Sequence, residues 1–275
     1  MSDTAVQFIA NARMYSVNAP ARVAWAELFS LVSRESGVDL DVVDHAFPAP
    51  LAELWSRPDL AAAFMCGLPY IRTGNPPKPI AAPVPRHAPV AGQPVYATCL
   101  VVKAGSPFQT IEDTFGGRVG YTVEDSHSGW NALRHHLLPY WLARGSNLYR
   151  ESVGPLYTPR RVIEALLSDT IDIGPLDSYA LDLMLRHEPD LRERIRIVAT
   201  TEAAPIPFLV ASAGCPDMIV TRLREAFLAL GGAPKAAELR EQLCLERFAP
   251  VNLADYEIVA RWEDEAKAAG YDRPG

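Results

Sequence analysis

Eight prolines fall between residues 69 and 94, and this stretch constrains the fold more than any other part of the sequence. Proline fixes φ and lacks a backbone N–H, so a long helix is excluded there. At most one edge strand, over residues 80–84, is expected. Patterns of alternating strand and helix lie on both sides of this stretch, which we therefore interpret as a hinge or a boundary between two lobes.

The segment before the prolines predicts a parallel α/β sheet. Apolar strands are expected at residues 5–10, 38–43 and 60–65, with helices at 20–36 and 50–56 between them. Such a βαβαβ order is the usual start of a parallel sheet with helices on both faces.

The alternation restarts after the prolines. Strands are expected at residues 95–103, 118–123, 171–174, 195–199 and 208–211, and helices at 110–115, 128–138, 159–167, 177–187 and over most of 217–270. Thr158 and Pro159 are a typical N-cap and first helical residue, and Pro139 is expected to disturb or end its helix. The predicted domains are residues 1–97 and 203–275 for the first lobe and 98–202 for the second. Crossings are expected near 95–98 and 200–208.

Charge and composition exclude several classes of protein. The chain has 275 residues, 49% of them hydrophobic, and a formal charge of −7. Nucleic-acid binders concentrate Lys and Arg on one face, so no nucleic-acid partner is expected. A single small anion remains compatible, because it needs only a few local N–H groups and side chains.

The cysteines and the first residues bear on the compartment. The four cysteines form no CxxC pair and are expected to be buried free thiols. The sequence contains no run of 18 or more apolar residues, so no membrane span is predicted. Residues 1–4 lack the features of a secretory signal, so we expect a cytoplasmic protein for the sequence as written, or a periplasmic one if the sequence starts after a removed signal.

The segment Ser126-His127-Ser128-Gly129 is the leading candidate site for a ligand. It lies where a predicted strand runs into a predicted helix. N–H groups at a helix start, together with the helix dipole, favour an anion, and Gly129 permits close approach to the backbone. Simple N-capping by Ser126 or Ser128 is the alternative.

Other candidates follow predicted strands in the same way. Asp177 lies at a second strand–turn–helix junction and either caps its helix or faces a ligand. Cys66, Gly67 and Tyr70 follow the third strand of the first lobe. Ligands of open parallel sheets bind outside the carboxyl ends of the strands, so these segments, with Tyr15 and Tyr96, are expected to converge in a cleft between the lobes.

Motifs of known enzymes are absent or weak in the sequence. There is no Gly-x-Ser-x-Gly, His-Glu-x-x-His, GxxxxGK[ST] or GxGxxG after the first strand. His135 and His136 point to different helix faces and cannot chelate one metal. We therefore expect no metal, no cofactor and no catalytic residue, with His127 as the one candidate general base.

Five segments in order resemble the phosphate, phosphite and phosphonate solute-binding proteins of ABC transporters. They are residues 13–15, 66–70, 96–102, 126–134 and 172–178. The resemblance implies the two-lobed type 2 periplasmic-binding-protein fold, in which each lobe is a mixed, mostly parallel sheet flanked by helices and two hinge crossings join the lobes. It also implies a small anionic or polar ligand and an ABC permease as partner.

The resemblance also implies roles for individual residues. The oxyanion would be held by the segment Ser126-His127-Ser128-Gly129, and Asp177 would accept a hydrogen bond from the ligand. Thr98 would donate a hydrogen bond near the hinge. The residues that would close the cleft are Tyr15, Tyr70 and Tyr96.

Two departures from that family alter the expected ligand. His127 stands in the middle of the serine motif, and Leu156-Tyr157 stands where relatives that bind phosphorus oxyanions tend to present a Thr-Gly-Ser-His-type turn. A carboxylate, or a ring stacked on Tyr157 or Trp130, is therefore as compatible as a phosphonate. Three functions remain open: a solute-binding protein, a cytoplasmic lyase or decarboxylase that uses His127 or Asp177 for proton transfer, and a ligand sensor.

Overall fold

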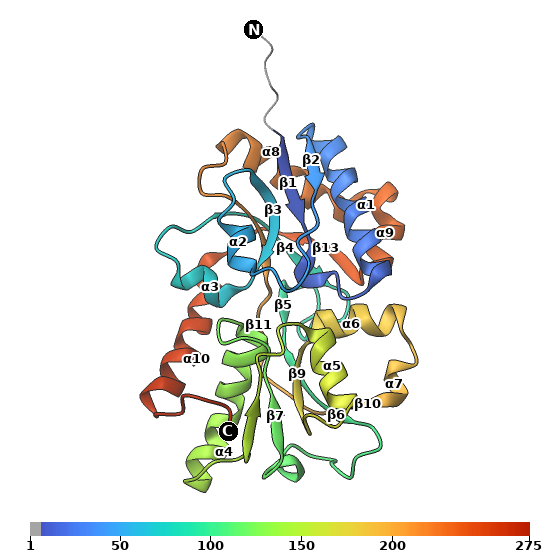
Figure 1. Ribbon diagram of the computed structural model, residues 1–275. Coiled ribbons are helices and arrows are strands. Elements are labelled where there is room, and N and C mark those ends of the chain that lie inside the picture. Colours follow the sequence, from blue (N-terminus) through green and yellow to red (C-terminus); the bar gives the residue numbers. More distant parts are fainter. Residues whose placement is uncertain (1–6) are drawn as a thin grey trace. The chain divides into compact units, whose positions relative to one another are not determined.

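The chain divides into two compact units (Figure 1). The structure is a computed structural model that describes residues 7–275. Unit 1 contains residues 7–86, 91–94 and 206–252, and unit 2 contains residues 87–90, 95–205 and 253–275. Each unit has its own sheets, helices and core.

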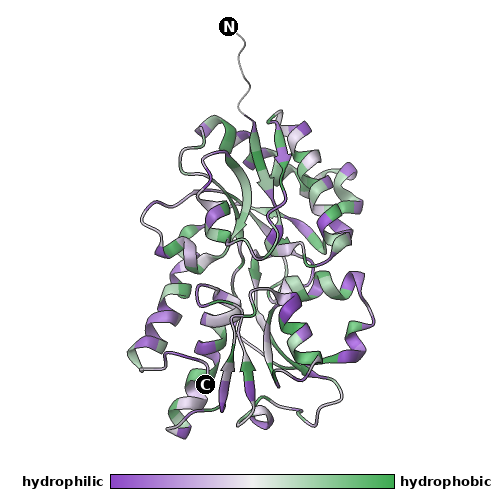
Figure 2. Cartoon of the chain, in the orientation of Figure 1, coloured by the Kyte–Doolittle hydropathy of each residue, from purple (hydrophilic) through white to green (hydrophobic). Residues whose placement is uncertain are grey.

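Unit 1 is built on a six-stranded sheet. Its strands are β1 (Phe8–Asn11), β2 (Leu40–Val42), β3 (Leu60–Met65), β4 (Lys78–Pro85), β12 (Phe208–Ala211) and β13 (Leu245–Ala249), in the order β13-β4-β12-β3-β1-β2. The β1–β2 and β1–β3 pairs are parallel, and the others are antiparallel. Figure 2 shows these strands as mostly hydrophobic, and β1, β3 and β12 are buried along their whole length.

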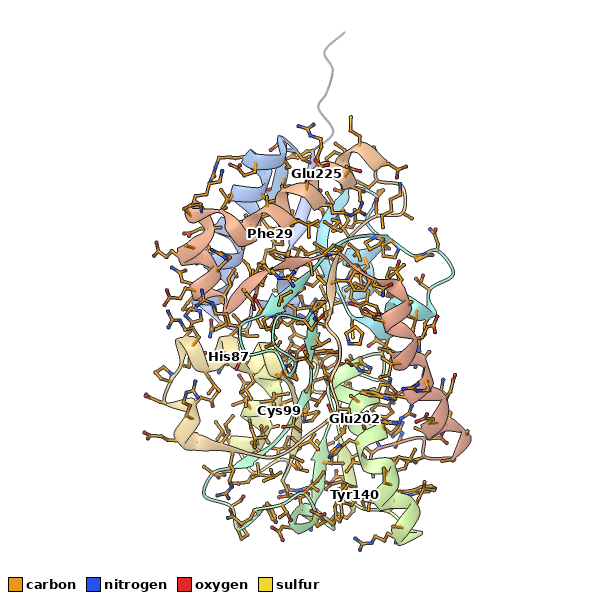
Figure 3. All side chains as sticks on the ribbon, turned by 180° about the vertical axis from the view of Figure 1, so that it is seen from behind. Phe29, His87, Cys99, Tyr140, Glu202 and Glu225 are labelled. Carbon is orange, nitrogen blue, oxygen red and sulfur yellow. The ribbon has the colours of Figure 1, made fainter. Side chains whose placement is uncertain are left out.

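The helices of unit 1 begin and end largely where the sequence predicts. They are η1 (Arg13–Tyr15), α1 (Ala19–Ser36), α2 (Leu51–Trp55), α3 (Gly67–Arg72), α8 (Asp217–Ala229), η4 (Leu230–Gly232), η5 (Pro234–Ala236) and α9 (Ala237–Gln242). Asn18 caps α1 by accepting the Ala21 N–H at 3.0 Å, and Gly37 ends it at a φ of 62°. Phe29 of α1, labelled in Figure 3, packs edge-on against Phe227 of α8. The predicted βαβαβ opening is confirmed. Ala5 and Val6 of its first strand lie outside the described residues.

The proline-rich stretch differs from expectation. It forms β4, which is not an edge strand but lies between β12 and β13. Three of its eight residues are prolines and cannot donate to a ladder. Both of its ladders have a register shift, at Leu209/Val210 and at Leu245/Arg247, and such irregular pairing is where missing N–H groups are tolerated.

Unit 2 contains three small sheets. Its strands are β5 (Val95–Tyr96), β6 (Thr98–Lys103), β7 (Arg118–Gly120), β8 (Glu151–Val153), β9 (Gly174–Asp177), β10 (Ile195–Thr200) and β11 (Ala204–Pro205). The order β10-β6-β9 is antiparallel, β7 and β8 are parallel, and β5 pairs antiparallel with β11. The sheet of unit 1 is therefore mixed, as expected, whereas each sheet of unit 2 is of one kind, and antiparallel pairs outnumber parallel ones in both units.

Helices cover the sheets of unit 2. They are η2 (Glu112–Thr114), the π-helical turn η3 (His127–Ala132), α4 (Leu133–Arg144), α5 (Pro159–Leu167), α6 (Ser178–His187), α7 (Leu191–Arg194), η6 (Leu253–Tyr256) and α10 (Glu257–Ala268). Thr158 caps α5 through the Arg161 N–H, as predicted. Pro139 does not end its helix. The turn beyond it continues to Arg144 because Tyr140 packs on Phe115 and Trp141 stacks on Tyr271.

The C-terminal segment belongs to a different unit from the one expected. Residues 253–275 pack on unit 2, and α10 lies beside α4 and η3 (Figure 1). Side chains of η3 and α4 hold it there, because Asn131 donates to the Val259 carbonyl at 2.8 Å and Arg134 donates to the Asp272 carbonyl at 3.1 Å. Of the residues predicted for the first lobe, 87–90, 95–97, 203–205 and 253–275 therefore lie in unit 2 instead.

In residues 7–275, no helix is both long enough and apolar enough to span a membrane.

Candidate functional site

The serine-rich segment forms a capped helix start in unit 2. Ser126 precedes η3, and its Oγ accepts the Gly129 N–H at 3.0 Å. The Ser126 carbonyl accepts the Asn131 N–H at 3.1 Å, five residues on, so the helix starts with a wide π turn. Ser126 and Ser128 are partly exposed and His127 is buried. Solvent can therefore reach both serine residues but not the imidazole.

Gly129 permits a very close contact at this turn. A Cβ on residue 129 would lie 1.8 Å from Oγ1 and 2.8 Å from Cβ of Thr122. Thr122 is buried, and its N–H donates to the Gly129 carbonyl at 3.3 Å. Only glycine fits at this contact, which holds the helix start against the segment that follows β7.

Thr98 connects the serine turn to Asp177. Its Oγ1 donates to the Ser128 carbonyl at 3.1 Å, and it pairs with Asp177 across the β6–β9 ladder. The two strand–turn–helix junctions predicted from sequence therefore lie together in unit 2. An anion at the serine turn would have the start of a second helix, α6, close to it.

Asp177 caps α6. Its Oδ1 accepts the N–H groups of Tyr179 at 2.8 Å and Ala180 at 3.0 Å. The capping alternative is thus confirmed. A ligand contact through the same carboxylate stays a prediction, and it would use acceptor capacity beyond these two bonds.

Tyr157 lies beside the serine turn in a strained conformation. Its N–H donates to the Thr122 carbonyl at 3.0 Å, so it adjoins the residue that contacts Gly129. Its φ is 66°, in the left-handed region that disfavours large side chains, and the residue is 48% exposed. Backbone strain of this kind is concentrated at functional sites.

Trp130 is not available for stacking on a ligand. It is buried, packs edge-on against Tyr121 with ring centroids 4.9 Å apart, and lies under the Arg134 guanidinium at 5.7 Å. Of the two rings that the sequence offers for stacking, Tyr157 is the exposed one.

His127 and Tyr96 lie inside unit 2. Their ring centroids are 6.1 Å apart, and both residues are buried. Burial, with a smaller contribution from the neighbouring His135, lowers the pKa of His127 from 6.5 to about 3. The imidazole is therefore neutral at ordinary pH and adds no positive charge to the anion site.

Asn131, Thr122 and Trp262 were missed in the sequence. Asn131 follows His127 by four residues, so helical spacing could have placed it on the same face. Trp262 stacks on His127 with ring centroids 5.3 Å apart. Nothing local predicts a contact between residues so distant in the chain.

The unit 1 candidates also gather in one place. Tyr15 ends η1 after β1, and Cys66 precedes α3 after β3, the parallel neighbour of β1. Tyr15 packs edge-on against Phe64, and Tyr70 does the same against Phe208. Gly67, the first residue of α3, is also buried. Carboxyl ends of neighbouring parallel strands thus position this set, as expected, and its contact with a ligand stays a prediction.

All four cysteines are buried, and none forms a disulfide. Cys99 on β6, labelled in Figure 3, has its thiol pKa raised to about 12, mainly by burial and then by Asp177. Such thiols are unreactive. Within residues 7–275, no group of three or more His, Cys, Asp or Glu residues could hold a metal ion.

Comparison with known proteins decides the family. The family described as "ABC transporter, phosphonate, periplasmic substrate-binding protein" matches residues 14–256. The chain belongs to this family. As a member it is a solute-binding protein, and the lyase or decarboxylase alternative is not favoured. No curated protein matches the chain.

Solved structures confirm the two-lobed type 2 periplasmic-binding-protein fold. A binding protein component of an ABC phosphonate transporter from Pseudomonas aeruginosa has 13% identity and a TM-score of 0.79, with 96% of this chain and 89% of that chain covered. PhnD1 from Prochlorococcus marinus, in complex with methylphosphonate, has 15% identity and a TM-score of 0.71, with 98% and 100% covered. A Xanthomonas citri protein bound to ATP has 18% identity and a TM-score of 0.65, with 96% and 98% covered.

Proposed function

We propose that this family member is the receptor of an ABC permease and binds a small anion at the Ser126–Gly129 turn. Family membership supports the receptor role. The proposed binding place rests on the arrangement of the turn. Two accessible serines stand at the start of an 18-residue run formed by η3 and α4, whose dipole favours an anion. The family is described as periplasmic, which supports the same location for this chain.

The exclusion of His127 from solvent favours a receptor function over an enzymatic one. A proton-transfer group must reach its substrate, and its pKa should lie near the working pH. His127 is buried and its pKa is far below that range. Asp177 Oδ1 already accepts two N–H groups of its own helix, so this carboxylate has a structural role as a cap.

The exposed ring of Tyr157 supports a ligand that has an apolar part as well as an anionic group. The ring adjoins the turn through Thr122, and its strained backbone persists although a glycine would relieve it. A phosphonate or a carboxylate that carries a hydrophobic substituent fits this combination. Inorganic phosphate offers nothing for the ring to contact.

Calorimetric titration of four probes tests the function and the part played by Tyr157. Inorganic phosphate, methylphosphonate, phenylphosphonate and benzoate are titrated into the wild-type chain and into Y157A, Y157G and Y157F. We expect saturable binding. The affinity for phenylphosphonate should be about tenfold higher than that for methylphosphonate, because one aromatic contact contributes about 1.4 kcal/mol.

The variants separate the effect of the Tyr157 ring on binding from the effect of its backbone strain on stability. Y157A and Y157G should both lose the preference for the aromatic probe, and Y157F should keep it. Y157G alone should raise the free energy of unfolding, by about 1 kcal/mol, because glycine adopts the φ of 66° without strain. Binding of none of the four probes would contradict the proposed function, and an unchanged preference in Y157A would contradict the role of the ring.

A further inference from the structure

Asn131 links the serine turn to the C-terminal helix. Its side chain is fully buried, and Nδ2 lies 2.8 Å from the Val259 carbonyl oxygen and 3.1 Å from Nδ1 of His127. A carbonyl only accepts, so the nitrogen of the amide, and not its oxygen, must face Val259. The orientation of the Asn131 amide is thereby fixed.

This orientation determines the protonation of His127. The two hydrogens of Nδ2 serve one acceptor each, the Val259 oxygen and the His127 Nδ1. Nδ1 therefore carries no proton. The ring is neutral, its one proton is on Nε2, and Nε2 can act only as a donor.

Trp262 of α10 fixes the plane of the same ring. Its indole stacks on His127 at an interplanar angle of 20° and on His135 at 7°, and His135 in turn lies 2.8 Å from Glu265 of α10. Helix α10 thus contacts η3 and α4 through three side chains on one helix face, at positions 127, 131 and 135. The residue that departs from the family's serine motif is the one that receives these contacts.

We propose that His127 is a positioning residue, held by Asn131 and Trp262 as the neutral Nε2–H tautomer, through which α10 fixes the ligand-binding turn. The tautomer depends only on contacts within unit 2. Its effect on ligand affinity rests on the proposed function.

Nitrogen NMR of the full-length chain tests the tautomer directly. Long-range ¹H–¹⁵N spectra distinguish protonated from unprotonated ring nitrogens, and H127Q identifies the His127 signals by their loss. We expect a protonated Nε2 and an unprotonated Nδ1 that do not change between pH 5 and pH 8. A protonated Nδ1, or an average of two tautomers, would overturn the proposal whatever the chain binds.

The variant N131D tests the role of Asn131. A carboxylate can only accept, so Nδ1 should become protonated, and the added negative charge near the turn should weaken methylphosphonate binding about fivefold or more. The matched control is N147D, which adds the same charge at an exposed asparagine of unit 2 and should change neither readout. A wild-type His127 spectrum in folded N131D would contradict the proposal. Should N131D fail to fold, the wild-type spectrum still decides the tautomer.

Discussion

Replacing Gly129 with alanine should destabilise the chain by about 3 kcal/mol and abolish anion binding. The new Cβ would lie 1.8 Å from Thr122 Oγ1, with Thr122 Cβ and Cγ2 both at 2.8 Å. Thr122 is buried, so its side chain has no free space into which to move. Either the core is overpacked or the helix start moves away from the segment after β7. Urea unfolding and calorimetry with phenylphosphonate measure the two losses.

Two further variants show whether the contact with Thr122 is the cause. G105A makes the same substitution in unit 2 where the new Cβ meets nothing within 4 Å, so stability should change by less than about 0.5 kcal/mol. The double variant G129A/T122A removes the two γ atoms and leaves one contact at 2.8 Å, so part of the stability should return. A G129A chain as stable as wild type would show that the turn does not need this approach.

Acid should destabilise the wild-type chain more than the H127Q variant. Burial lowers the folded-state pKa of His127 from 6.5 to about 3. Below pH 6.5 the unfolded chain takes up a proton at this residue, whereas the folded chain does not until near pH 3. The free energy of unfolding therefore falls as the pH drops through this window, by about 3 kcal/mol between pH 6.5 and pH 4. H127Q lacks this titration.

Urea unfolding at pH 7 and pH 4 measures the difference. Carboxylates contribute equally to both chains, so the loss of stability between the two pH values should be about 3 kcal/mol smaller in H127Q. His136, whose pKa burial also lowers, acts in the same direction in both chains. Equal acid sensitivity in H127Q and wild type would contradict the burial of a neutral imidazole.

Local sequence signals predict much of the fold. The strands at residues 60–65 and 208–211 have the predicted bounds, and Thr158-Pro159 starts its helix as predicted. Burial and capping determine these features, and both can be recognised from neighbouring residues. Ser126 as a cap and the buried cysteines follow from the same kind of reasoning.

Pairing between distant segments accounts for the differences between the predicted and the observed strands. Gly174-Pro175 looks like a turn, yet it forms strand β9, because β9 is an edge strand and proline is tolerated there. The proline-rich stretch becomes an inner strand because β12 and β13 arrive from more than 120 residues later in the chain. Such partners have no local signal.

The candidate site was likewise predicted only where local sequence determines it. Ser126, Ser128 and Gly129 were predicted from the strand–helix junction, and the structure places Thr98 and Asp177 beside them. His127 was predicted to face the ligand together with the serines, and the structure directs it inward, toward Trp262 and Asn131. A residue 135 positions away in the sequence decides this orientation, so no pattern around the serines could predict it.

Backbone amide NMR most directly tests the claim that the Ser126–Gly129 turn holds the anion. Phenylphosphonate is titrated into the ¹⁵N-labelled full-length chain, and the chemical shifts of all amides are followed. The largest saturable changes should fall on residues 126–130 and on the Asp177–Ala180 helix start, whose N–H groups and carboxylate lie close to the turn. Saturable binding that leaves both helix starts unchanged and shifts other amides would contradict the account.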